Sequence, residues 1–225
     1  MEFTHLPSFT FVEGSHNAYP GLSIKRSIFF AKTIPNYWII SDKITGSGTH
    51  TFDQYFHLAP MYKLHTNLNL LTHSVTTPYF GLYPSDTTAS AKIIVGWGLD
   101  KYNRKEEDPV VKFSKTGKPP VTFETVLFLY TSEIFSVNVP KEQVFNGNDL
   151  VDSTDAFCIK INYGNNNDWF FKSDSDTLLL NYGSFSSRSK LAFVKVIDDS
   201  SVANFQLILG SELYYNNKSL IDSWK

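Results

Sequence analysis

The stretch YWIISDKITGSGTHTFDQYFHLAP, residues 37–60, holds the pattern on which the fold depends. It contains two runs rich in β-branched and aromatic residues, 37–44 and 51–58, and such runs are typical of β-strands. The segment TGSGT between them is rich in Gly, Ser and Thr, which are typical of turns. We therefore predict two strands joined by a tight turn, and we interpret the pair first as a hairpin rather than as a reactive site.

The second of these runs alternates between polar and apolar residues. Because successive side chains of a strand point to opposite faces, Asp53, Tyr55 and His57 are expected on an outer face. The opposite face is expected to carry core residues, namely Phe52, Phe56 and Leu58. A Tyr–His pair can perform general acid–base chemistry when the two pKa values are tuned, so Tyr55 and His57 are catalytic candidates. The alternative, which we favour, is an ordinary polar face of a sheet.

Strand signals of the same kind recur along the whole chain. No window of twelve or more residues shows a helical period, and the best helix candidate, residues 140–145, is about one turn long. The run VTFETVLFL at 121–129 predicts a half-buried strand, GNNND at 164–168 a hairpin turn, and the charged segment 99–109 a solvated loop. The other expected strands are residues 9–13, 25–34, 91–97, 156–163, 168–173, 176–182, 190–197 and 204–210. We predict an all-β fold, an antiparallel β-sandwich with very little helix, that forms a single domain over residues 1–225.

Composition narrows the expected partners and compartment. The 16% aromatic content suits strands, and a formal net charge of −2 provides no basic surface for nucleic acid or for an anionic membrane, so neither is expected as a partner. No apolar run has the length of a membrane span, and the N-terminus has no signal-peptide pattern. The chain as given is expected in the cytoplasm, and in the periplasm or outside the cell if its natural front end is missing. The single cysteine, Cys158, lies in an apolar run and is expected to be a buried, inert thiol.

The remaining motifs offer little chemistry. All six histidines lie in the first third of the chain, but no HExxH, His-x-His or CxxC spacing accompanies them, so we expect no metal site. His16 and Tyr19 lie in a turn-like segment, EGSHNAYPG, and are further catalytic candidates, although turns commonly hold such residues for local hydrogen bonds. A nucleophile elbow and a phosphate-cradling glycine-rich loop are both missing, and no cofactor is expected.

Four stretches together resemble a known family. They are EGSHNAY (13–19), residues 25–60, GWGLDKYN (96–103) and PPVTFETVLFLY (119–130). In order and spacing they are similar to the C-terminal β-sandwich region of the bacterial heparinase II/III-like polysaccharide lyases. The resemblance covers about residues 9–130, and the matching positions are Arg26, Tyr37, Trp38, Asp42, Gly48, His50, His57, Gly96, Trp97, Phe123 and Thr125.

The resemblance implies a function for the longer enzymes of this family. They cleave uronic-acid-containing polysaccharides by β-elimination, and an α/α toroid that precedes the sandwich supplies Asn, His and Tyr residues of the catalytic machinery. We expect the metal ligands of some members upstream of residue 1, so no catalytic or metal residue is transferred to this chain. The leading hypothesis is therefore a lyase sandwich that is inactive by itself, with an α/α catalytic domain as partner.

Two alternatives remain. The first is a carbohydrate-binding module in which exposed aromatic rings stack on a polysaccharide or oligosaccharide, with Trp97, Tyr102 and Trp169 as the candidate residues. The second is a structural or oligomerisation domain whose exposed sheet meets another copy of the chain.

Overall fold

The computed structural model describes residues 1–101, 104–131, 136–198 and 201–221. Contacts within the chain divide it into two compact units, Met1–Phe135 and Ser136–Lys225, which we describe separately. Apart from one short 3-10 turn, η1 (Pro60–Tyr62), the regular elements among the described residues are strands paired in antiparallel fashion. The all-β prediction is therefore confirmed.

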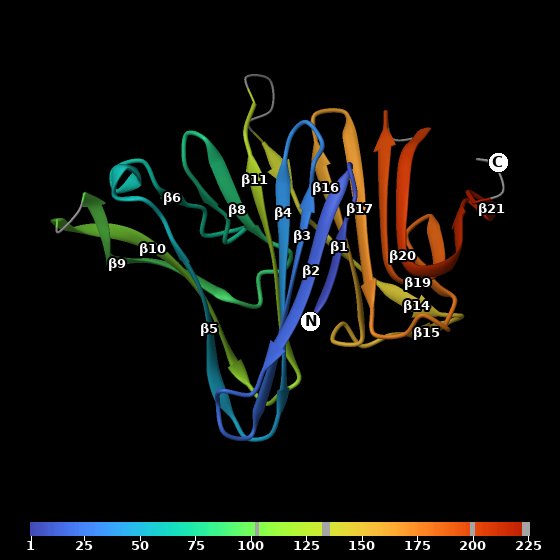
Figure 1. Ribbon diagram of the computed structural model, residues 1–225, viewed down its shortest axis with the longest axis horizontal. Helices are drawn as coiled ribbons and strands as arrows, with labels where there is room; N and C mark the ends of the chain where they lie inside the picture. The colour runs from blue at the N-terminus through green and yellow to red at the C-terminus, as the bar shows by residue number, and fades with distance from the viewer. Residues whose placement is uncertain (102–103, 132–135, 199–200, 222–225) are drawn as a thin grey trace. The chain divides into compact units, whose positions relative to one another are not determined.

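The first unit is built from two sheets (Figure 1). The larger sheet has eight strands in the order β1 (Glu2–His5), β2 (Phe9–His16), β3 (Leu22–Ala31), β4 (Tyr37–Gly46), β11 (Val121–Leu129), β8 (Phe80–Pro84), β7 (Val75–Thr76) and β6 (Asn67–Leu68). The smaller sheet has three strands in the order β5 (His50–His57), β10 (Arg104–Gly117) and β9 (Ser90–Lys101).

The two sheets pack face to face over a shared apolar core. Ile44 and Phe123 come from the larger sheet, and Phe52, Val111 and Phe113 come from the smaller one. All five side chains are buried, and Phe56 packs against Phe113 with the ring centroids 6.0 Å apart. This two-layer arrangement is the predicted sandwich, and alternating apolar residues form its core because a strand turns every second side chain inward.

The segment between β4 and β5 is not a hairpin, so this prediction was wrong. β4 pairs with β3 and β11, whereas β5 pairs with β10 in the other sheet. The turn carries the chain from one layer to the other, and the two strands meet through side chains across the core. Gln54 Nε2 donates to Asp42 Oδ2 at 2.9 Å. Gly46 and Gly48, at φ 140° and 88°, adopt backbone conformations that favour glycine and permit this change of layer.

Three further local predictions were wrong. Strand β11 is not half-buried, because Thr122, Glu124, Val126 and Phe128 on its second face are buried as well. Residues 140–145 form no helical turn and include β13 (Lys141–Glu142) and part of β14 (Val144–Asn146). The charged segment 99–109 is not a loop, because β9 and β10 continue through its described residues as a long antiparallel pair.

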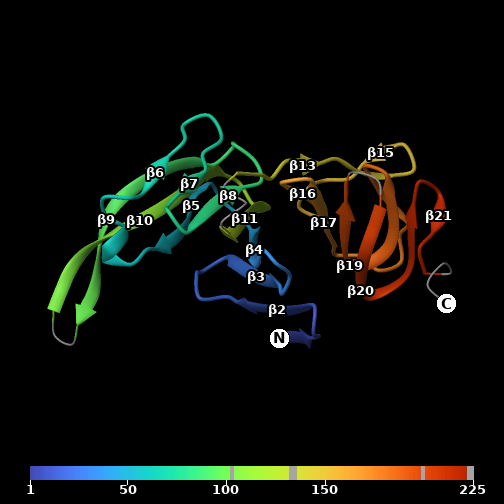
Figure 2. The same cartoon turned by 90° about the horizontal axis from the view of Figure 1, so that it is seen from above.

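The second unit contains one ten-stranded sheet (Figure 2). Its centre is β16 (Ala156–Tyr163), β17 (Asn166–Ser173), β19 (Phe185–Ile197) and β20 (Ser201–Tyr215). The remaining strands are β12 (Val137–Asn138), β13, β14, β15 (Asp149–Leu150), β18 (Leu180–Tyr182) and β21 (Lys218–Ser219). The hairpin predicted around residues 164–168 is confirmed, since β16 pairs with β17 and Gly164 has a positive φ of 54°.

Strand β19 pairs with both β17 and β18 in the second sheet. Its first residues pair with β18 and its last residues pair with β17, so both neighbours lie along the same edge. As a result, Phe171 on β17 stacks on Tyr182 on β18, with centroids 4.4 Å apart and planes 5° apart. Cys158 is fully buried in this core, as predicted, and burial raises the pKa of its thiol well above the usual value. Within the described residues, no helix is long and apolar enough to cross a membrane.

Candidate functional site

A hollow of about 630 Å³ lies in the first unit, beside the edge strand β5. The three-stranded sheet ends at β5 and leaves the neighbouring face of β3 uncovered, which creates this space. Its floor is apolar and consists of Leu22, Ile24, Ile44, Phe52 and Phe123. Its walls are polar and aromatic and consist of His16, Tyr19, Arg26, Asp42, His50, Thr51, Asp53 and Tyr55. An apolar floor with a few polar groups, at this volume, is typical of a small-molecule or sugar site.

Arg26 and Asp42 form the best-defined polar contact of the hollow. They face each other on the paired strands β3 and β4, and Nε and Nη2 of Arg26 donate to the two carboxylate oxygens of Asp42 at 2.6 and 2.7 Å. The hydrogen bond to Asp42 raises the pKa of Arg26, so its guanidinium stays charged. Asp42 also accepts from Gln54, whose Oε1 accepts from Thr125 Oγ1 at 2.8 Å. This chain of hydrogen bonds fixes the guanidinium at the wall of the hollow.

Asp53 and Tyr55 form a second polar group on β5. The Tyr55 hydroxyl donates to Asp53 Oδ2 at 2.8 Å, and Ser114 Oγ donates to Oδ1 at 2.5 Å. Desolvation alone would raise the pKa of Asp53, but hydrogen bonds from Ser114, Tyr55 and Lys112 outweigh it and lower this pKa. The hydrogen bond to Asp53 raises the pKa of Tyr55. A tyrosine held in this way is a poorer proton acceptor at neutral pH than a free phenol.

The turn between β2 and β3 brings two more candidates to the hollow. His16 and Tyr19 lie with their ring centroids 6.1 Å apart, and the Ala18 backbone N–H donates to His16 Nδ1 at 3.3 Å. His50 at the start of β5 points Nε2 at the Ser47 carbonyl, 2.9 Å away. The structure therefore brings together three of the four catalytic candidates, His16, Tyr19 and Tyr55.

His57, the fourth candidate, does not line the hollow. It lies on the outer face of β5 as predicted, and its Nδ1 is 3.3 Å from Asp108 Oδ2 on β10. Asp108 is only 4% exposed because it lies over Gly96 on β9, where a Cβ atom would come within 2.5 Å of Asp108 Oδ1. The Gly-Trp-Gly segment thus makes room for a buried carboxylate, a role that its sequence did not indicate.

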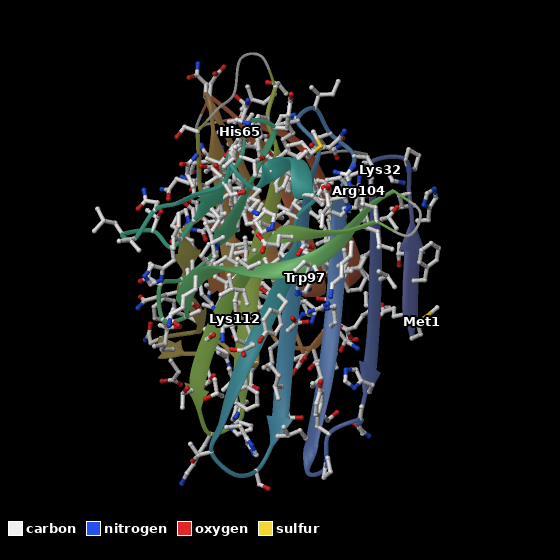
Figure 3. All side chains as sticks on the ribbon, turned by 90° about the vertical axis from the view of Figure 1, so that its left-hand side faces the viewer. Met1, Lys32, His65, Trp97, Arg104 and Lys112 are labelled. Carbon is white, nitrogen blue, oxygen red and sulfur yellow. The ribbon has the colours of Figure 1, made fainter. Side chains whose placement is uncertain are left out.

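The three residues predicted to stack on sugars fall in different parts of the chain. Trp97 belongs to the first unit, where it is 57% exposed on β9 and Lys105 Nζ lies 4.1 Å from its ring centroid. Figure 3 labels Trp97, on β9, and Lys112, on the neighbouring strand β10. Trp169 belongs to the second unit, where it is partly buried and packs against the core residue Phe185, with centroids 5.2 Å apart. Tyr102 lies outside the described residues.

Metal ligands do not converge in the part of the chain that the structure describes. No group of three or more His, Cys, Asp or Glu side chains there has an arrangement that could hold a metal ion. The hollow contains His16 and His50, but each imidazole makes a local contact with the backbone.

Sequence reasoning gave no role to Arg26, Asp42 and His50, although all three were positions of the family resemblance. Their proximity depends on the β3–β4 register and on the change of layer after β4. The one usable signal was an Arg and an Asp at matching positions of two consecutive strands, which is a common cross-strand ion pair.

The fold is that of the β-sandwich of polysaccharide lyases. The heparan sulfate lyase HepC from Pedobacter heparinus has a similar structure, with a TM-score of 0.60 and 16% identity, over 88% of this chain and 27% of that one. A heparinase III is similar with a TM-score of 0.55 and 12% identity, over 87% of this chain and 27% of that one. The chain thus spans about a quarter of the length of these lyases.

Sequence comparison gives the family. The family model described as heparinase II/III-like, C-terminal, matches residues 7–192. The chain therefore belongs to the heparinase II/III-like family, as the resemblance in four of its stretches had indicated. No curated protein sequence matches it.

Proposed function

We propose that this chain is the β-sandwich part of a polysaccharide lyase that acts on uronic-acid-containing polysaccharides by β-elimination, and that it turns over no substrate by itself. The family match over residues 7–192 is the observation that carries this proposal. The partner is an α/α catalytic domain, either in a longer protein or as a separate chain.

The chemistry of β-elimination favours a sandwich that assists the catalytic domain and does not catalyse the reaction by itself. A base removes the proton at C5 of the uronic acid, the bond from C4 to the glycosidic oxygen breaks, and an acid protonates the departing oxygen. Neutralising the uronate carboxylate lowers the barrier to proton removal. Tyr55 is poorly suited to act as the base, because the hydrogen bond to Asp53 raises its pKa and keeps the hydroxyl protonated. Acid, base and charge stabiliser act as a unit, so a part of the set gives little turnover.

The test is an elimination assay on the purified chain. The chain is incubated with heparan sulfate and with other uronic-acid polysaccharides, and the absorbance of the unsaturated product is followed. We expect no turnover by the chain alone and turnover once an α/α domain is supplied. Robust turnover by the chain alone that is lost in the Tyr55→Phe variant would show that the hollow is itself a catalytic site.

A carbohydrate-binding module without catalysis is the second candidate function. The exposed Trp97 favours it, because one flat face of an exposed indole can stack on a sugar ring. The other face is partly covered by Lys105. Saccharide binding that is lost in the Trp97→Ala variant would support this function, and unchanged binding would count against it.

A further inference from the structure

We propose that the hollow beside β5 binds one acidic sugar residue, with the oxyanion of that sugar against Arg26 and His16 and its ring against Tyr19 and Tyr55. The choice of a saccharide as ligand rests on the proposed function. The choice of an acidic residue, and its orientation, rest on the hydrogen-bonding groups of the hollow.

The two carboxylates of the hollow already have donors. Asp42 accepts from Arg26 at 2.6 and 2.7 Å and from Gln54 at 2.9 Å, and it is 4% exposed. Asp53 accepts from Ser114 and Tyr55, and Lys112 Nζ lies 3.3 Å from its Oδ2. Because these oxygens are satisfied within the protein, they offer a ligand few strong acceptor sites.

The donors of the hollow remain available. Asp42 occupies Nε and one hydrogen of Nη2 of Arg26, so the other N–H bonds of the guanidinium can donate to a ligand. The Arg26 side chain is 53% exposed, so a ligand can reach it. In His16, Nδ1 accepts a hydrogen bond from the Ala18 N–H, which places the proton of the neutral ring on Nε2. A site with satisfied acceptors and available donors is complementary to an oxyanion, such as a carboxylate or a sulfate.

The aromatic groups explain why a sugar ring would lie here. Tyr19 is 57% exposed in the turn between β2 and β3, and Tyr55 is 48% exposed on β5. Both line the hollow, one from each sheet's side of it, and each offers a flat apolar surface together with a hydroxyl group. The apolar floor of Ile44, Phe52 and Phe123 is rigid because these side chains belong to the core of the sandwich.

The test is a calorimetric titration with two probes. One probe is an oligosaccharide derived from heparan sulfate, and the other is an uncharged cello-oligosaccharide of the same length. We expect saturable binding of the acidic probe only. Tyr19→Ala, Tyr55→Ala and His16→Ala should each weaken it by about fivefold or more, because one stacking contact or one charge-assisted hydrogen bond is worth about 1 kcal/mol. These side chains are exposed, and thermal melts should show that the variants stay folded.

One further variant serves as a control, and another tests the role of the guanidinium. Tyr79→Ala removes a tyrosine that is 62% exposed and does not line the hollow, and it should leave the affinity unchanged. Arg26→Lys keeps the positive charge beside Asp42 but removes the guanidinium, which can donate several hydrogen bonds at once. It should therefore lower the affinity for the acidic probe.

Three results would overturn the proposal. The first is equal affinity for the charged and uncharged probes, and the second is no binding of the acidic probe. The third is affinity for the acidic probe that falls in Trp97→Ala but not in Tyr19→Ala, Tyr55→Ala or His16→Ala. The proposed function is judged separately, by elimination in the presence of an α/α domain. If elimination is normal and the hollow variants bind the acidic probe as well as the unchanged chain does, only the present proposal is wrong. If the chain binds the acidic probe but no elimination occurs with an α/α domain, only the proposed function is wrong.

Discussion

Replacing Asp42 with Ala should destabilise the first unit strongly, because this carboxylate connects its two sheets. Asp42 on β4 accepts from Gln54 on β5 at 2.9 Å, and it also holds Arg26 on β3. After the substitution the Gln54 amide, only 2% exposed, loses its acceptor, which costs about 1–3 kcal/mol. Arg26 is half-exposed and can turn to water, so its lost contact adds only about 1 kcal/mol. The free energy of unfolding should therefore fall by about 2–4 kcal/mol.

Urea denaturation followed by fluorescence measures this loss, and Asp53→Ala is the matched control. Asp53 also has three donors, namely Ser114, Tyr55 and Lys112, but they lie on the outer face of the paired strands β5 and β10. Water can replace the Asp53 carboxylate there, so we expect Asp53→Ala to lower the free energy of unfolding by less than about 1 kcal/mol. Hydrogen exchange should locate the effect of Asp42→Ala in peptides of β4 and β5. If Asp42→Ala costs no more than Asp53→Ala, the buried connection between the sheets does not have the stabilising role that we assign to it.

Three further predictions concern packing and burial. Gly96→Ala should lower the free energy of unfolding by about 1–3 kcal/mol, because a Cβ would lie 2.3 Å from Val110 Cγ2. Gly14 has open space around it, so Gly14→Ala should be nearly neutral. Equal urea midpoints for the two variants would contradict this prediction. The Cys158 thiol, whose pKa is raised by burial, should not react with a thiol reagent at mildly alkaline pH until urea unfolds the protein, and rapid reaction of the native protein would disprove it. Burial raises the pKa of Tyr182, whereas a tyrosine in the unfolded chain ionises at about pH 10. The contribution of Tyr182 to the stability of the folded state is therefore present below that pH and should be lost as the pH rises above it. Urea midpoints that stay constant between about pH 9 and pH 11 would refute this prediction.

Much of the fold could be predicted because strands leave a strong local signal. Residues 121–129 and 156–163 were predicted with the bounds that the structure has; Pro120 precedes the first run, and Asp155 and Gly164 flank the second. Strand β10 was missed because Arg104–Asp108 is charged, and charge in a sequence suggests a solvated loop. In the structure these residues pair with β9, where Arg104 and Lys105 are exposed, Glu106 and Glu107 are partly exposed, and Asp108 is buried.

The candidate site was predictable only in part. His16, Tyr19 and Tyr55 were identified as reactive residue types, and the alternation of β5 correctly placed Tyr55 and His57 on its outer face. Their separation into different environments could not be predicted. Tyr55 lines the hollow, whereas His57, two residues further along, pairs with Asp108, a partner 51 residues away in the chain.

The sequence by itself determined that the chain is all-β, which residues form most of its strands, and that it resembles the heparinase II/III-like family. The first two properties are local, because the period of two and the turn residues are visible within about ten positions. The resemblance depends on the order and spacing of four stretches. Only the tertiary structure decided that β4 and β5 lie in different sheets, that Thr125 bonds to Gln54 across the core, and that Arg26, Tyr19 and Tyr55 surround one hollow. The physical reason is that a turn rich in glycine permits both a hairpin and a change of layer. The choice depends on whether the preceding strand β4 or the distant strand β10 offers β5 the better pairing and core.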